Sequence, residues 1–210
     1  MNTYHKIQTV FKRDPDNNYK TLLEGQFSTP ELEYLADAEW CFQEKVDGMN
    51  VRICYHHDNG IINFKGKTDK ADFPKPLGLR LEERFRKNGS FDFFPDHFDT
   101  DVCLYGEGYG SKIQKGGKYR DDQDFVLFDI KIGNTWLQRK DVEEIGAELD
   151  LDVVPVLDHG TLWDMVEAVR DGFRSQWGDF IAEGIVARPA VELLDRRGHR
   201  VITKLKHKDF

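Results

Sequence analysis

The sequence predicts an α+β fold with largely antiparallel sheets, formed by a single domain over residues 1–210. Two observations support this prediction. The expected elements run from strands to helices and back to strands, and short turns such as Asn59-Gly60 join neighbouring strands. The chain has 210 residues, of which 39% are hydrophobic, so it can bury a substantial core.

Local signals place the individual elements. A hydroxyl cap and an early proline begin a short helix at Ser28-Thr29-Pro30-Glu31. From 41 to 64 we expect a strand, a turn at Asp47-Gly48, a second strand and a further hairpin. Helices are expected at 77–87, 139–149 and 162–173, where apolar residues recur at helical spacing. Further strands are expected at 101–109, 125–132, 181–188 and 201–206.

Composition and cysteine usage limit the class of protein. No apolar run approaches the roughly 20 residues that cross a bilayer, and the N-terminal residues lack the apolar core of a signal peptide. Cys41, Cys54 and Cys103 are far apart and form no C-x-x-C pair, which argues against a disulfide framework or a structural zinc site. We expect a cytoplasmic protein, monomeric and with no membrane partner.

Basic residues are clustered, although the formal net charge is -8. A negative net charge argues against a nucleic-acid partner, but binding depends on the local potential. The three clusters are Lys65, Lys67, Lys70 and Lys75; Lys112, Lys115, Lys118 and Arg120; and Arg196, Arg197, Arg200, Lys204, Lys206 and Lys208. Taken one at a time, each cluster is more simply interpreted as a solvated loop.

A lysine before a tight turn is the first candidate for chemistry. The segment Glu44-Lys45-Val46-Asp47-Gly48 places Lys45 at the end of an apolar approach, just before a turn from which a strand leaves. Such a turn projects a side chain into a cleft. The pattern is weak when taken alone, because a surface hairpin with a solvated lysine also produces it.

Five segments together resemble the covalent nucleotidyltransferases, which comprise ATP-dependent RNA and DNA ligases and the mRNA capping enzymes. In their order along the chain they resemble the nucleophile, ribose-contacting, base-stacking, metal-binding and paired-lysine motifs of that family: Glu44-Lys45-Val46-Asp47-Gly48, Tyr105-Gly106-Glu107, Phe125-Val126-Leu127-Phe128-Asp129-Ile130, Glu183-Gly184-Ile185-Val186 and Lys204-Leu205-Lys206. The resemblance implies a nucleotidyltransferase domain with an ATP-grasp-like ligase adenylation fold. Its largely antiparallel sheets would flank a nucleotide cleft, with no C-terminal OB-fold.

The resemblance implies that Lys45 is the nucleophile that becomes bonded to AMP. An ordinary lysine, with a pKa of roughly 10.4, is protonated at neutral pH and cannot attack phosphorus. Nearby cations lower that pKa. Lys204 and Lys206, two residues apart on one strand, would point the same way and supply such charge, although an exposed edge strand with solvated lysines is the alternative. Glu183, in an otherwise apolar strand, needs either a metal that bridges phosphates or an ion pair with one of these lysines.

Other positions receive roles by the same resemblance. Glu107 would accept a hydrogen bond from a ribose hydroxyl, and Phe128 would stack on adenine, with Phe125 on the opposite face of the strand as its competitor. Arg52 would hold the AMP phosphate or a 5′-phosphate end. Lys67 stands where RNA ligases often have arginine. The remaining nucleotide-binding candidates are Glu44, Asp47, Gly48 and Asn50.

The activity implied is that of an ATP-dependent RNA ligase that uses Mg²⁺ or Mn²⁺. Lys45 would attack the α-phosphate of ATP, release pyrophosphate and carry AMP. The AMP would pass to a 5′-phosphate end of RNA, and a 3′-hydroxyl would then seal that end, for example at a nick in a duplex. Phage-type RNA repair in the host cytoplasm is a reasonable setting.

Other interpretations stay open. Asn50 stands where DNA ligases usually have arginine, and the sequence ends soon after the paired lysines, where DNA ligases and capping enzymes carry an OB-fold. Both features favour an RNA ligase over those enzymes. The alternatives are an ATP-dependent DNA ligase, a capping enzyme, a self-adenylylating nucleotidyltransferase module that needs a partner, and an α+β binding protein with accidental motifs.

Overall fold

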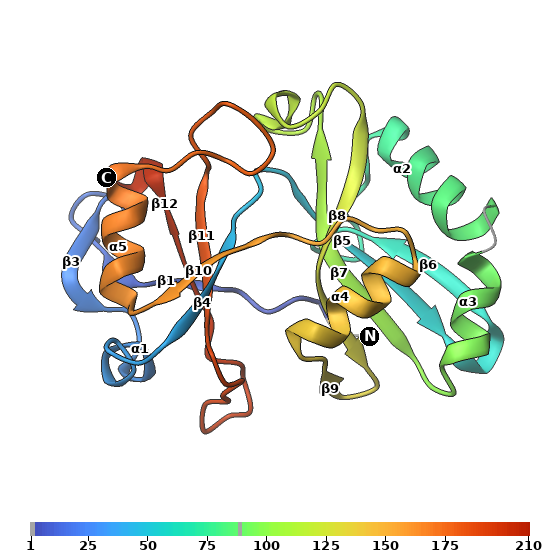
Figure 1. Ribbon diagram of the computed structural model, residues 1–210, viewed down its shortest axis with the longest axis horizontal. Helices are drawn as coiled ribbons and strands as arrows, with labels where there is room; N and C mark the ends of the chain where they lie inside the picture. The colour runs from blue at the N-terminus through green and yellow to red at the C-terminus, as the bar shows by residue number, and fades with distance from the viewer. Residues whose placement is uncertain (1–2, 88–89) are drawn as a thin grey trace. The chain divides into compact units, whose positions relative to one another are not determined.

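Figure 1 shows the computed structural model, which describes residues 3–87 and 90–210. Within these residues the chain forms two units. The first contains the residues up to Tyr4 together with Asp47–Val154, and the second contains His5–Val46 and Pro155–Phe210. Each unit has its own five-stranded sheet and its own hydrophobic core. That the two units make up one nucleotidyltransferase domain stays a prediction.

The sheet of the first unit is antiparallel throughout, in the order β6-β5-β7-β8-β9. Its strands are β5 (Met49–His56), β6 (Ile61–Lys65), β7 (Val102–Gly110), β8 (Gln123–Ile132) and β9 (Thr135–Trp136). Alternate residues of β5, such as Val51 and Ile53, belong to the core together with Phe125 of β8. One face of the sheet is therefore buried, and the residues between these core positions lie on the other face.

Helices cover the buried face of this sheet. They are α2 (Lys75–Glu82), which continues into a π-helical turn, η2 (Glu83–Lys87), then α3 (Ser90–His97) and α4 (Arg139–Glu148). Leu77 and Leu81 of α2 and Val142 of α4 are fully buried in the core. Neither these helices nor the other helices of the described chain are long and apolar enough to cross a membrane.

A buried carboxylate on β8 forms ion pairs with the helical segment that begins with α2. Arg80 and Arg84 from the helical segment and Arg120 from the preceding loop all contact one oxygen of Asp124, at 3.3, 2.8 and 2.9 Å. Burial acts to raise the pKa of Asp124, but the hydrogen bonds and charges of the arginines outweigh it and hold that pKa below its ordinary value. The carboxylate therefore stays ionised, and its negative charge offsets part of the positive charge of the three arginines.

The second unit is built on a sheet in the order β1-β12-β11-β4-β10, in which only β1 and β12 run parallel. Its strands are β1 (Gln8–Thr9), β4 (Trp40–Glu44), β10 (Val156–Gly160), β11 (Gly184–Pro189) and β12 (Thr203–Lys206). β2 (Phe11–Arg13) and β3 (Leu22–Phe27) form a separate pair. The core contains Trp40, Phe42 and Leu205.

Two helices with hydroxyl caps complete the second unit. α1 (Pro30–Tyr34) begins after Thr29, whose side chain accepts a hydrogen bond from the backbone N–H of Leu32, as the sequence predicts. α5 (Leu162–Asp171) begins with a capping box formed by Thr161 and Asp164. The apolar side chains of α5 pack into the core of this unit.

The α+β class with mostly antiparallel sheets is confirmed, but two local expectations are wrong. The turn at Asp47-Gly48 does not join a hairpin, because β4 and β5 belong to different sheets. The strand expected at 181–188 begins only at Gly184, so Glu183 precedes β11 instead of lying within it. The expected elements also leave out the strands β1, β2, β3, β9 and β10 and the helix α3, because these segments are short and carry no clear periodic pattern.

The cysteine spacing argues against a disulfide framework, yet the structure joins Cys54 and Cys103 by a disulfide. The two residues are 49 positions apart in the sequence, but the antiparallel register of β5 and β7 places them directly opposite each other. Spacing along the chain carries no information about such a pairing. Cys41 takes no part in this disulfide.

Gly106 on β7 tests how closely the first unit is packed. A Cβ atom there would lie 2.2 Å from the carbonyl oxygen of Val126 and 2.3 Å from the ring of Phe125. We expect Gly106→Ala to lower the free energy of unfolding by about 1–3 kcal/mol because the sheet must deform. Gly78→Ala is the control, since Gly78 lies within α2 with nothing near its missing side chain; it should raise stability by up to about 1 kcal/mol. Urea denaturation measures both, and equal effects would contradict the packing described.

Candidate active site

Lys45 of the second unit follows directly after β4, where the position of the backbone is fixed by β11. Ile185 of β11 pairs with Glu44 of β4, and the backbone N–H of Lys45 donates to the carbonyl of Gly184 at 2.9 Å. Gly184 itself admits no side chain, because a Cβ atom would lie 2.0 Å from the carbonyl oxygen of Leu205 on β12. The close approach of three strands thus places Lys45 beside the start of β11.

One carboxylate joins two lysines at this point. The Nζ atom of Lys45 lies 2.8 Å from Oε2 of Glu183, and Nζ of Lys206 lies 2.5 Å from Oε1 of the same side chain. The three side chains are 18%, 10% and 23% exposed in the order Lys45, Glu183 and Lys206. Burial acts to raise the pKa of Glu183, but the charges and hydrogen bonds of the two lysines hold it below its ordinary value. With two ammonium groups and one carboxylate, this half-buried cluster has one positive charge more than it has negative charges.

The paired lysines lie on one side of β12. Lys204 and Lys206 are partly exposed, whereas Thr203 and Leu205, which alternate with them, are buried. The sequence prediction that both lysines point the same way agrees with this alternation. The sequence analysis predicted either a metal or an ion pair with one of these lysines as the partner of Glu183. In the structure Lys206 forms such an ion pair.

Glu44 anchors the strand that presents Lys45. Its side chain is 2% exposed; one oxygen accepts a hydrogen bond from the hydroxyl of Ser175 at 2.6 Å and the other from the backbone N–H of Gln176 at 2.8 Å. These contacts hold the end of β4 against the segment that follows α5. Ser175 and Gln176 were not found from the sequence, because they lie more than a hundred residues away from Glu44 and belong to no motif. A nucleotide-binding role for Glu44 stays a prediction.

A second group of candidate residues lies on the first unit, on the face of its sheet opposite the helices. Asn50 pairs with Glu107, and Arg52 pairs with Tyr105, in the register of β5 and β7. The Oδ1 atom of Asn50 is buried and has no hydrogen-bond partner among the residues described. A buried, unpaired polar atom costs free energy. Its position beside Glu107 therefore fits a surface that binds a polar ligand.

Arg52 is already engaged within the first unit. Its guanidinium donates to the carbonyl of Gly66 at 3.0 Å and to a carboxylate oxygen of Asp69 at 2.7 Å. The hydrogen bond from Arg52 lowers the pKa of Asp69 below its ordinary value. Lys67 is exposed on the same segment. To bind a phosphate, Arg52 would have to exchange Asp69 for it or share its guanidinium between the two.

The structure distinguishes the two aromatic candidates of β8. Phe125 is buried in the core, with its ring 6.4 Å from that of Phe85. Phe128 is partly exposed and lies at the irregularity in the pairing of β7 and β8, with its ring edge-on to Tyr4 at 5.1 Å. Only Phe128 of the two is available to a ligand in this structure. Asp47, also in the first unit, donates its backbone N–H to the hydroxyl of Tyr119 at 3.1 Å, and Gly48 leads into β5.

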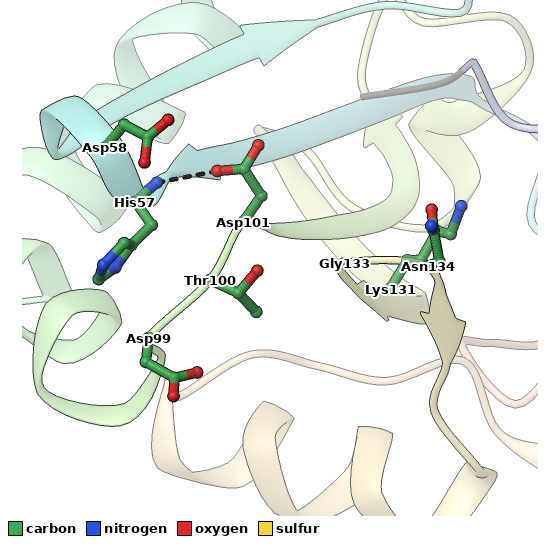
Figure 2. A pocket seen from close by; sticks show the side chains of 8 residues that line it. All are labelled: His57, Asp58, Asp99, Thr100, Asp101, Lys131, Gly133 and Asn134. Carbon is green, nitrogen blue, oxygen red and sulfur yellow. Dashed lines mark hydrogen bonds between the residues drawn. The ribbon is translucent and has the colours of Figure 1, made fainter.

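A separate pocket of about 460 Å³ in the first unit contains none of the predicted residues. Figure 2 shows its lining, in which the backbone N–H of His57 donates to Asp101, while Asp99 lies apart from that carboxylate. The carboxylates do not converge on a common point. Among the described residues, no group of three or more His, Cys, Asp and Glu side chains could hold a metal ion.

Glu183 is the one predicted metal ligand, and its chemistry fits Mg²⁺ or Mn²⁺. These ions prefer oxygen donors and are commonly bound through one or two carboxylates together with phosphate oxygens. Because no larger group of ligands accompanies Glu183 among the described residues, a metal there would need the phosphates of a nucleotide to complete its coordination. The donor set therefore fits a metal that arrives with a nucleotide.

Solved structures of another protein share this α+β fold. A variant of Naegleria gruberi RNA ligase with ATP and Mn matches with a TM-score of 0.70 at 17% identity, over 100% of this chain and 59% of that one. The same ligase with PPi matches with a TM-score of 0.66 at 17% identity, over 98% and 58%. This chain thus spans about three-fifths of the length of these solved structures.

The family is shown by sequence. Residues 38–206 match the family model described as RNA ligase, so the chain belongs to the RNA ligase family. No curated protein matches the chain. The matched region contains every candidate site residue from Glu44 to Lys206, and it leaves the first 37 residues outside.

The Glu183 ion pairs predict a pH dependence of stability. The folded pKa of this carboxyl lies below its unfolded value of roughly 4.3. Its contribution to stability is therefore complete above that value and is lost as the pH falls through the folded pKa. We expect Glu183→Gln to destabilise the protein at pH 7 by about 1.5–3 kcal/mol, and this difference should shrink toward pH 3. Glu167→Gln, at an exposed position of α5, is the control. A loss at pH 7 that is unchanged at low pH would contradict the ion-pair assignment.

Proposed function

We propose that this chain is the adenylation domain of an ATP-dependent RNA ligase and that Lys45 carries the AMP. The observation that carries the proposal is the cluster of Lys45, Glu183 and Lys206 in a chain of the RNA ligase family. A single carboxylate can balance only one of the two lysines. The excess charge favours the loss of a proton from one ammonium group, and a neutral Lys45 is the nucleophile that the chemistry requires.

The first step forms a bond between nitrogen and phosphorus. Nζ of Lys45, after losing a proton to solvent, attacks the α-phosphate of ATP; the bond from that phosphorus to the bridging oxygen breaks, pyrophosphate leaves, and the nitrogen gives up a second proton to solvent. Lys204 and Lys206 stabilise the negative charge that develops on the phosphate oxygens. A divalent metal held by Glu183 and the phosphates would supply further charge neutralisation.

The two later steps transfer and then release AMP. An oxygen of the 5′-phosphate of an RNA end attacks the phosphorus of the lysyl-AMP, and Lys45 is released with a proton. The 3′-hydroxyl oxygen of a second end then attacks the activated 5′-phosphate, AMP leaves, and the hydroxyl proton passes to solvent. By the family resemblance, Asn50, Glu107 and Phe128 hold the adenosine, and Arg52 holds a phosphate once Asp69 is displaced or shared.

A second candidate function is a self-adenylylating module that depends on a partner for sealing. The observation in its favour is that the described ion pairs around Lys45 bear on the lysyl-AMP step, whereas the two later steps rest on the family resemblance. Such a module would form the lysyl-AMP by the same cluster around Lys45. It differs from the ligase only in the two later steps.

Self-labelling with ATP carrying a radioactive α-phosphate tests the first step. We expect the wild-type protein to retain label on a denaturing gel in the presence of Mg²⁺, and Lys45→Ala and Lys45→Arg to lose it, because neither side chain provides a neutral amine. Lys140→Ala is the control, since that side chain is 83% exposed on α4. Label that survives both Lys45 substitutions would contradict the proposal.

The sealing steps are tested with nicked duplexes that carry a labelled 5′-phosphate. Joining of an RNA nick supports the ligase, and preferential joining of a DNA nick would favour a DNA ligase. Self-labelling without joining of either nick would favour the partner-dependent module. Stronger self-labelling with GTP than with ATP would favour a capping activity.

A further inference from the structure

The N-terminal segment, which lies outside the family match, forms a basic pocket with β12 in the second unit. The pocket has a volume of about 1070 Å³. Four of its basic side chains come from the N-terminal segment: Lys6, Lys12, Arg13 and Lys20. Three come from β12 and the turn that follows it: Lys204, Lys206 and Lys208. Asp209 is the one acidic residue that lines the described pocket.

This concentration of positive charge runs against the composition of the whole chain. The chain has 38 acidic and 30 basic residues, whereas basic residues line the pocket almost to the exclusion of acidic ones. Arg13 is paired with Asp209 at 2.7 Å, and Lys206 is paired with Glu183. Lys6, Lys12, Lys20 and Lys208 make no ion pair within the part of the chain that the structure describes. Like charges gathered in this way repel each other and favour an anionic ligand.

The backbone holds this arrangement in place. β1 runs parallel to β12, with Thr9 opposite Lys204, and the backbone N–H of Val10 donates to the carbonyl of Lys204 at 3.2 Å. Val10 and Phe11 are buried in the core. Both carboxylate oxygens of Asp209 accept hydrogen bonds. One accepts from the guanidinium of Arg13 and the other from the backbone N–H of Lys206. The N-terminal segment that carries Lys6, Lys12 and Lys20 is therefore held against the sheet by strand pairing and by core contacts.

An exposed aromatic ring accompanies the charges. Tyr19, which also lines the pocket, is 63% exposed. Its backbone has a φ of 58°, which is unusual for a large side chain, and its N–H donates to the carbonyl of Asp14 at 2.8 Å. A ring that is not used in the core and stands beside Lys20 is suited to stacking on a base.

From these observations we infer that the basic pocket binds the phosphate backbone of a single RNA strand, with Tyr19 as a stacking platform. The inference deepens the proposed function, on which it rests, by assigning a surface that leads an RNA strand to the paired lysines Lys204 and Lys206. An extended strand presents many phosphates, which matches the seven basic side chains that line the pocket. A free pyrophosphate, by contrast, would engage only a few of the lysines and none of the aromatic surface.

Binding of a fluorescent 5′-phosphorylated RNA to the nucleotide-free protein, measured by anisotropy at several salt concentrations, tests the inference. Each lost phosphate contact with a single strand reduces the slope of log K against log salt by about 0.7. We expect the double variant Lys12→Ala/Lys20→Ala to reduce the slope by about 1.4 and to weaken binding about tenfold at low salt. Its self-labelling with ATP should be unchanged, since neither lysine belongs to the site around Lys45.

The matched control removes the same charge elsewhere. Lys140→Ala/Arg196→Ala loses two positive charges at exposed positions that do not line the pocket, and it should leave the slope unchanged. Equal effects of the two double variants, or no effect of the first, would overturn the inference. A Lys12→Ala/Lys20→Ala protein that loses only the pyrophosphate-driven reversal of self-labelling, with RNA binding intact, would assign the pocket to pyrophosphate and also overturn it.

Crosslinking uses the wild-type protein, so its result does not depend on whether the substituted proteins fold. An RNA with 4-thiouridine at successive positions should crosslink to the tryptic peptides that contain Tyr19. Crosslinks confined to residues 47–154 would contradict the assignment. Because both RNA measurements omit ATP, they separate this inference from the proposed function: absent self-labelling with intact pocket binding would refute only the adenylation step.

Discussion

The site in the second unit depends on one half-buried carboxylate that two lysines share. Lys45 and Lys206 hold the pKa of the Glu183 carboxyl below its ordinary value despite its burial, and the carboxylate offsets the repulsion between the two ammonium groups. The three side chains come from the residue after β4, the residue before β11 and the last residue of β12. Their meeting therefore requires the order β12-β11-β4 in the sheet and the glycine at 184 that lets β11 approach β12.

The same strand, β12, connects this cluster with the basic pocket. Lys204 and Lys206 line the pocket, and Lys206 also contacts Glu183. Positive charge is thus continuous from the N-terminal segment to the carboxylate beside Lys45. For a phosphoryl-transfer reaction this continuity is useful, because the substrate ends, the nucleotide and the leaving group all carry negative charge. The family match begins only at residue 38, so the N-terminal part of this charge is a feature of this chain outside the matched region.

Much of the site could be predicted from the sequence because its residues lie in short local motifs. Lys45 precedes Asp47-Gly48, and the spacing of Lys204 and Lys206 implies a common face on a strand. The contacts that set these residues in place are long-range and leave no local signal. Glu44 binds Ser175, and the carbonyl of Gln8 accepts a hydrogen bond from Thr203, 195 positions away. The disulfide between Cys54 and Cys103 was missed for the same reason, since only the register of β5 and β7 brings the two residues together.

The most direct measurement of the central claim is the mass of the intact protein after incubation with ATP and Mg²⁺, followed by peptide mapping. The account predicts an increase by the mass of one AMP, located on the peptide that contains Lys45. The bond should be a phosphoramidate, labile in acid and stable in alkali, because it joins a lysine nitrogen to phosphorus. An adduct on another residue, an acid-stable ester, or no adduct at all would contradict the account.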